Sequence, residues 1–136
     1  MKTKLSFLFL VGMLFSISIF ASDPETTTYS NIQNTETGSI KEFTTFRANS
    51  TEPIQKSTYR YDLAGNIQEK VVYKWDLDLG WIGAQKLEYE YDQASPNKPV
   101  AMNFSEWDAR KKDWKAKQRN EFVNRGDGST SVNVRQ

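Results

Sequence analysis

Hydrophobic and polar residues alternate along several separate stretches of this chain. Between residues 81 and 91 the odd positions carry Trp, Gly, Gln, Leu, Tyr and Tyr, while charged residues occupy the even positions from 86 onward. A period of two residues is typical of a β-strand that buries one face. We therefore expect a strand over residues 81–92 that places the following side chains on one face: Trp81, Leu87, Tyr89 and Tyr91.

The same pattern occurs twice in the chain. Trp-x-Gly-x-Gln at residues 81–85 recurs as Trp-x-Ala-x-Gln at residues 114–118, a displacement of 33 positions. A Trp-Asp pair precedes each copy, at residues 75–76 and again at residues 107–108. Self-similarity with a period near thirty residues predicts a stack of β-hairpins in which each repeat packs beside the next.

Glycine, asparagine and proline signals divide the chain into about seven strands. Ala-Gly-Asn at residues 64–66 predicts a tight turn, and loops at residues 76–80 and 108–113 close the two tryptophan hairpins. The expected strands cover residues 40–47, 55–62, 67–76, 81–92, 100–108, 114–124 and 131–135.

One irregularity separates the two hairpins. Tyr73 and Trp75 are two residues apart, whereas their apparent counterparts Phe104 and Trp107 are three apart. Keeping both rings of the second hairpin on one face requires an extra residue, which predicts a β-bulge at Ser105-Glu106.

The fold class is therefore all-β, an antiparallel meander of repeated aromatic hairpins with one aromatic and one charged face. The chain has 4 Trp, 6 Tyr and 8 Phe, and flat rings pack well on a pleated surface. Because an aromatic face must be buried, we expect the sheet to curl on itself, to be covered by its own first strands, or to pair with another sheet.

The first 21 residues have the pattern of a secretory signal peptide. Two lysines precede an apolar run over residues 5–20, and the sequence turns polar at Ser22. We expect cleavage after Ala21, because the run is short for a membrane-spanning helix and no positive stop-transfer cluster follows it. The chain has no cysteine to accept a lipid or form a disulfide. We expect an exported protein, periplasmic or secreted, that is not a lipoprotein.

Two segments follow the predicted leader. Residues 22–39 are polar, rich in threonine and without periodicity, which predicts a flexible lead-in. Residues 40–136 are expected to form a single β-hairpin-repeat domain. The formal net charge of +1 gives no general case for a nucleic-acid partner, and we expect no membrane span after signal cleavage.

Short motifs connect the chain to known families. Residues 59–67 read Tyr-Arg-Tyr-Asp-Leu-Ala-Gly-Asn-Ile, which resembles the Tyr-Asp repeat of bacterial Rhs-type shell proteins and implies hairpin geometry. The chain also has Met-Lys-Thr-Lys at residues 1–4, Tyr-x-Tyr-Asp turns, and Tyr-Lys-Trp at residues 73–75. In these features it resembles an uncharacterised family of small exported Bacteroides proteins, the domain-of-unknown-function family numbered 3836. The resemblance implies export and an all-β module.

Few residues offer catalytic chemistry. The chain has no histidine and no cysteine, which excludes Ser-His and Cys-His catalysis and histidine-ligated metal sites. Glu88 and Glu90 lie about 7 Å apart on one strand face by strand geometry, a spacing in the range of glycosidase carboxylates. They alternate with aromatic residues, so we interpret them as solvent-facing charges. Asp76-x-Asp78-x-Gly80 lacks the later ligands of a calcium loop and is typical of a hairpin turn. We expect no enzymatic activity, no metal and no cofactor.

Aromatic residues near the hairpin loops are the candidate binding residues. They are Trp75, Trp81, Trp107, Trp114, Tyr89 and Tyr91. Such rings fill a core as cross-strand pairs, or stack on sugars and bury against a protein when they are partly exposed. We expect an exported non-catalytic interaction module that binds a protein or glycan through these side chains or through strand edges. The alternatives are a self-assembling structural spacer of the envelope and a polysaccharide-acting hydrolase.

Overall fold

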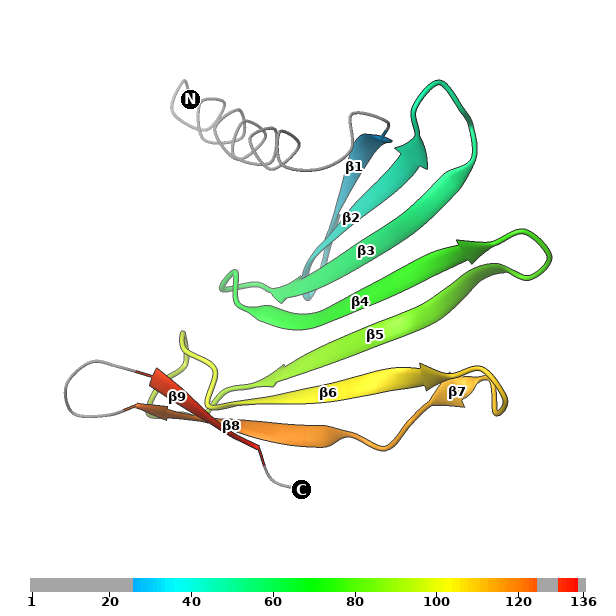
Figure 1. The fold of residues 1–136 in the computed structure, drawn as a ribbon. Coiled ribbons are helices and arrows are strands. Elements are labelled where there is room, and N and C mark those ends of the chain that lie inside the picture. Colours follow the sequence, from blue (N-terminus) through cyan, green and yellow to red (C-terminus); the bar gives the residue numbers. More distant parts are fainter. Residues whose placement is uncertain (1–25, 125–129, 135–136) are drawn as a thin grey trace, which may run out of the picture.

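The computed structural model describes residues 26–124 and 130–134, which form a single antiparallel β-sheet (Figure 1). The signal peptide predicted for residues 1–21 lies outside the described residues. The strands are β1 (Thr26–Thr35), β2 (Gly38–Arg47), β3 (Pro53–Asp62), β4 (Ile67–Asp76), β5 (Gly80–Glu90), β6 (Ala101–Asp108), β7 (Asp113–Trp114), β8 (Gln118–Asn124) and β9 (Thr130–Val134).

The strands follow one another across the sheet in the order of the chain. The order is β1-β2-β3-β4-β5-β6-β8-β9, and the short β7 pairs with β6 beyond the end of β8. The sheet twists strongly but does not close, so β1 and β9 lie at opposite edges (Figure 1). The predicted all-β meander is confirmed, and both tryptophan hairpins are present, as β4–β5 and β6–β7.

The first strand corrects the prediction of a flexible lead-in. Residues Thr26–Thr35 form β1 and pair with β2 in ten consecutive register positions. Threonine, Tyr29 and Ile32 favour extended backbone because branched and aromatic side chains suit a pleated surface. The hairpin turns at residues 36–37, and β2 begins at Gly38, where a Cβ would lie 1.9 Å from the carbonyl oxygen of Tyr61 on β3. Polarity alone was therefore a poor guide to order in this segment.

A bulge in β5 changes which side chains share a face. Tyr73 lies opposite Gly83 and Val72 lies opposite Gln85, so Ala84 is an extra residue in β5. Directly paired residues point to the same face, and neighbours along a strand point to opposite faces. Trp81 and Gly83 therefore share a face with Trp75, whereas Leu87 and Tyr89 point to the other side. The prediction of one face for Trp81, Leu87 and Tyr89 was wrong, because a bulge reverses the alternation.

The bulge predicted at Ser105-Glu106 was also wrong. Those two residues pair with Lys86 and Gln85 in unbroken register, so Phe104 and Trp107 lie on opposite faces of β6. The extra residue is instead on the partner strand. Trp107 pairs with Trp114, and Phe104 pairs with Gln118. Two residues separate these paired positions in β6, and three separate them in the opposite segment, which runs from β7 into β8. The second hairpin thus has the same irregularity as the first, and the predicted sixth strand is divided into β7 and β8.

The sheet has almost no core of its own. Val71, Ala101 and Ser105 are the only buried residues in the described part of the chain. The contacts between strands join neighbours in the sheet, and β1 and β2 extend the edge instead of covering a face. The expected covering by the first strands is therefore not found. Long lysine side chains partly shield the rings, as when the Lys56 Nζ lies 5.2 Å from the ring centroid of Tyr73.

Candidate functional site

All four tryptophans lie on one face of the sheet, which we call the tryptophan face. They form two cross-strand pairs, Trp75 with Trp81 and Trp107 with Trp114. The ring centroids are 5.1 Å apart at 73° in the first pair and 5.2 Å apart at 80° in the second. These edge-to-face geometries are favourable for aromatic rings. Each pair is therefore held in a defined orientation at the loop end of its hairpin.

Aspartate side chains fix the two hairpin loops beside these pairs. The Asp76 Oδ1 atom accepts hydrogen bonds from the N–H groups of Asp78 and Leu79, both at 2.9 Å. The Asp108 Oδ1 atom accepts in the same way from Arg110 at 2.9 Å and Lys111 at 3.1 Å. Asp76 therefore caps its own turn, in agreement with a polar hairpin loop. Among the described residues, no group of acidic side chains is placed to hold a metal ion.

The tryptophan pair of the second hairpin packs against Gly83 of β5. A Cβ at Gly83 would lie 2.7 Å from the Cε3 atom of Trp107 and 3.0 Å from the Cη2 atom of Trp114. The rings of the second hairpin therefore extend over the backbone of β5, the strand that also carries Trp81 on the same face. The two indoles of the second hairpin can approach β5 this closely only because Gly83 has no side chain.

A lysine lies over one ring of each pair. The Nζ atom of Lys56 is 4.9 Å from the ring centroid of Trp81, and that of Lys86 is 4.9 Å from the ring centroid of Trp114. A cation at this distance is attracted by the negative face of the indole. All four indoles are half-buried, with part of each ring open to solvent. We call the set the tryptophan platform, defined by Trp75, Trp81, Trp107, Trp114, Lys56 and Lys86.

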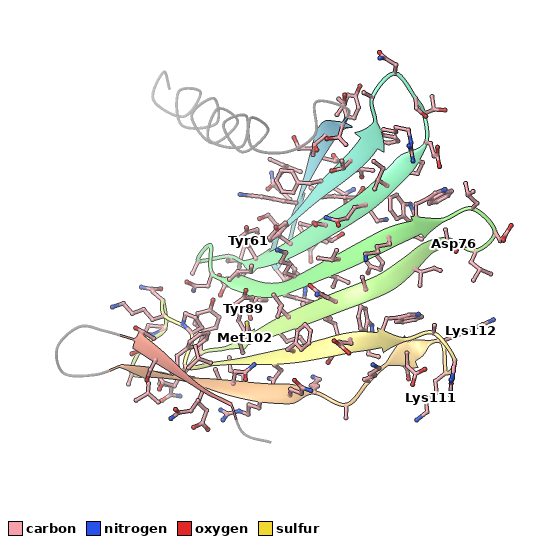
Figure 2. The ribbon with its side chains drawn as sticks, in the orientation of Figure 1. Tyr61, Asp76, Tyr89, Met102, Lys111 and Lys112 are labelled. Atoms are coloured by element: carbon pink, nitrogen blue, oxygen red, sulfur yellow. The ribbon has the colours of Figure 1, made fainter. Side chains whose placement is uncertain are left out.

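The two tyrosine candidates are not part of this platform. Tyr89 pairs with Met102 on the opposite face, and Figure 2 shows both in a row with Tyr61, away from the hairpin loop that carries Asp76. The hydroxyl of Tyr91 donates a 2.7 Å hydrogen bond to the carbonyl oxygen of Ile67, and burial raises the pKa of Tyr91. The structure therefore divides the six sequence candidates between two separate places.

The carboxylates once compared with a glycosidase pair are both engaged. The Glu88 carboxylate forms a 2.8 Å ion pair with Lys117. Glu90 accepts hydrogen bonds from Arg119 at 2.9 Å and from Asn103 at 2.6 Å. The hydrogen bonds from Arg119 and Asn103 hold the pKa of Glu90 below its usual range. Glu88 and Glu90 are therefore both part of an ion-pair cluster with Lys117 and Arg119.

Sequence reasoning missed the two lysines of the platform and the role of Gly83. Lys56 and Lys86 are 30 residues apart, which is also the separation of Tyr59 and Tyr89 in the Tyr-x-Tyr-Asp motif. Extending the repeat search upstream of that motif would have found the lysines. The contact of Gly83 with the second hairpin had no comparable signal, because it depends on the bulge at Ala84.

The model of the family of unknown function DUF3836 matches residues 1–124, so the chain belongs to this family. Two solved structures are similar to it. A DUF3836 family protein from Parabacteroides distasonis shares 15% identity with a TM-score of 0.48, covering 80% of this chain and 89% of that one. One from Bacteroides vulgatus shares 16% identity with a TM-score of 0.45, covering 64% and 87%. No curated protein matches at a significant level. The described residues contain no helix suited to crossing a membrane.

Proposed function

We propose that this member of the DUF3836 family is an exported, non-catalytic interaction module whose tryptophan platform binds a glycan. The observation that carries the proposal is that four half-buried indoles lie on one face of the sheet, with the second pair packed over Gly83 on the strand that also carries Trp81. Their edge-to-face pairing fixes the rings before a ligand arrives, which lowers the conformational entropy lost on binding. Sugar rings present apolar faces that stack on such indoles.

The lysines add polar recognition to this surface. Lys56 and Lys86 each hold an ammonium group over an indole, at 4.9 Å from the ring centroid. An ammonium group has three hydrogen-bond donors, which suit the hydroxyl or carboxylate oxygens of a sugar. Figure 2 places Lys111 and Lys112 at the tip of the neighbouring hairpin, so further donors lie at the same end of the sheet.

A hydrolase is the less favoured alternative. Its candidate carboxylates, Glu88 and Glu90, are held by Lys117 and Arg119, and they point to the tryptophan face among other ion pairs. Export is proposed from the leader pattern of residues 1–21. Fractionation of cells that express the full chain should recover the protein outside the cytoplasm, shortened at its N-terminus.

Glycan binding can be tested with two aromatic residues of the same strand. Trp81 and Tyr89 both belong to β5 but lie on opposite faces. The wild-type protein should bind a subset of an array of bacterial and host glycans, and the ligand should shift its tryptophan emission. Trp81→Ala should weaken binding at least tenfold, whereas Tyr89→Ala should leave it unchanged.

A second pair of variants distinguishes a loss of binding from a loss of folding. Lys56→Gln and Lys86→Gln remove the ammonium groups and leave every indole in place, so they should weaken binding without loss of near-ultraviolet circular dichroism. An array without any bound glycan, or equal weakening by Trp81→Ala and Tyr89→Ala, would refute the platform as a glycan site.

A further inference from the structure

The edge strand β1 has none of the features that usually protect a sheet edge. Natural edges are shortened, bulged, or marked by lysine and proline, because unpaired N–H and C=O groups recruit other strands. β1 has ten residues, Thr-Thr-Thr-Tyr-Ser-Asn-Ile-Gln-Asn-Thr, without charge or proline. Its register with β2 is free of bulges. Within the described part of the chain, β1 pairs only with β2, which leaves one side of its backbone open.

The other edge of the sheet is different. β9 has five residues and offers half the length of backbone. Charge also distinguishes β1 from its neighbours, because β2 and β3 both carry lysine or glutamate. The longest uncharged strand of the sheet is thus the one at the open edge. A partner strand that pairs here meets no charge to desolvate.

Two large hydrophobic side chains of β1 are exposed to solvent. Tyr29 is 64% exposed and Ile32 is 46% exposed. Tyr29 lies on the tryptophan face, where it makes an edge-to-face contact with Phe46 at 5.7 Å and lines a shallow hollow of about 300 Å³. Ile32 lies on the opposite face, since it pairs with Lys41, which in turn pairs with Tyr59. An added strand would bring side chains against both residues at once.

We propose that β1 pairs antiparallel with β1 of a second copy of this protein, joining the two sheets edge to edge. A second copy is favoured as the occupant because the strand is uncharged, so two identical strands oppose no like charges. The twofold axis stands perpendicular to the sheet, and each face continues into the same face of the partner. Both tryptophan platforms then lie on one side of a continuous sheet.

Symmetry restricts the register of this pairing. Paired residues must share a face, and odd and even residues of β1 lie on different faces, so odd residues pair with odd and even with even. The axis therefore passes through a residue and not between two residues. The longest overlap places it at Ser30 or Asn31, in the middle of the strand.

The absence of native cysteine allows a clean cross-linking test of this register. A cysteine at the axis would lie opposite its own copy, at the 4.5 to 5.5 Å Cα separation of antiparallel pairs that a disulfide spans. The full-length chain should be expressed, purified as the host processes it, and oxidised as single variants. Either Ser30→Cys or Asn31→Cys should give a covalent dimer, whereas Asn34→Cys and the matched edge control Asn133→Cys on β9 should not.

A charge exchange tests the same contact without a covalent bond. Sedimentation of the wild-type protein should show a concentration-dependent dimer. Ser30→Lys combined with Asn31→Lys should raise the dimer dissociation constant at least tenfold, as should the matching double change to glutamate. Mixing the lysine and glutamate variants should restore the dimer, because opposite charges then face each other across the axis.

The outcomes are decisive in both directions. Position-independent cross-linking, or a wild-type protein that stays monomeric up to about 0.5 mM, would overturn the pairing of β1. So would a dimer that the lysine variant leaves unchanged. None of these results depends on glycan binding, which involves other strands, so the two proposals fail or stand separately.

Discussion

The indole of Trp107 lies directly over Gly83, so that a Cβ on Gly83 would be 2.7 Å from the Cε3 atom of the ring. This contact packs the tryptophan pair of the second hairpin onto a strand of the first. A single methyl group added at Gly83 is therefore a sensitive probe of this contact.

Gly83→Ala should lower the free energy of unfolding by about 1–3 kcal/mol, the usual cost of forcing extra volume into a packed contact. Urea denaturation measures this loss, and tryptophan emission should shift because the indoles of the second hairpin move. Gly65→Ala is the control. Gly65 has a φ of 85° with no atom near its missing Cβ, so its substitution should cost stability through backbone strain and leave the emission unchanged. Identical emission spectra for Gly83→Ala and wild type would contradict the contact.

Deletion of Ala84 should prevent folding or cost more than about 3 kcal/mol, because removing one residue moves half of β5 to the wrong face. Ala84→Ser keeps the extra residue and should stay within about 1 kcal/mol of wild type. Deletion of Leu79, an exposed loop residue, should be far milder than deletion of Ala84. Thermal unfolding followed by circular dichroism ranks the three variants, and a stable Ala84 deletion would contradict the bulge.

Stability should depend on the ionisation of Asp62 in acid. The N–H group of Asn66 donates to the Asp62 carboxyl at 2.8 Å, and this hydrogen bond is the main reason that the pKa of Asp62 lies below its usual value. A lowered folded-state pKa means that this contribution to stability is complete above the ordinary aspartate pKa. It is lost as the pH falls through the folded-state value.

The test is the urea midpoint between pH 6 and pH 3. The midpoint of the wild-type protein should fall more steeply across this range than that of Asp62→Asn, which cannot ionise. Parallel curves for wild type and Asp62→Asn would show that the turn draws no stability from the charge.

Glu90→Gln should cost about 0.5–1 kcal/mol, a modest amount because both side chains of the Glu90–Arg119 pair remain 39–40% exposed. Glu106→Gln is the matched control. Its pair with Lys115 is more than half exposed on both sides, and its loss should cost no more than a few tenths of a kcal/mol. The difference between the variants, measured by urea denaturation, should shrink in 0.5 M salt. Equal effects for both would mean that the partial burial of the Glu90–Arg119 pair adds nothing to its strength.

The sequence predicts the hairpins well and the faces poorly, for a physical reason that Trp81 and Leu87 illustrate. Both occupy odd positions of an alternating pattern, so a regular strand would place them together. The extra residue at Ala84 leaves the alternation of residue types along the sequence intact. It nevertheless reverses the face of the sheet to which the odd-numbered side chains after it point. A bulge is visible only in the pairing with the neighbouring strand.

The same limit explains the error at Ser105-Glu106. Comparison of Phe104 with Tyr73 suggested an insertion in the first strand of the second hairpin. The pairing instead makes Trp107 the equivalent of Trp75, because each lies opposite the other tryptophan of its hairpin. It makes Phe104 the equivalent of Val72, because each lies opposite a glutamine, Gln118 or Gln85. The chemical similarity of two aromatic rings misled the alignment. Of the candidate binding residues, the four tryptophans share one face of the sheet, whereas Tyr89 lies on the other.

The meander order has a consequence for how quickly the chain finds its structure. From β1 to β6, every ladder joins strands that follow each other directly, so each pairing closes a loop of between two and ten residues. Short loops cost little chain entropy, and folding rates rise as the sequence separation of contacts falls. Each hairpin also offers its free edge as a template for the next strand to emerge. We expect the strands to pair one after another along the chain. Hydrogen exchange should be slowest in β4 and β5 and faster toward both edges of the sheet.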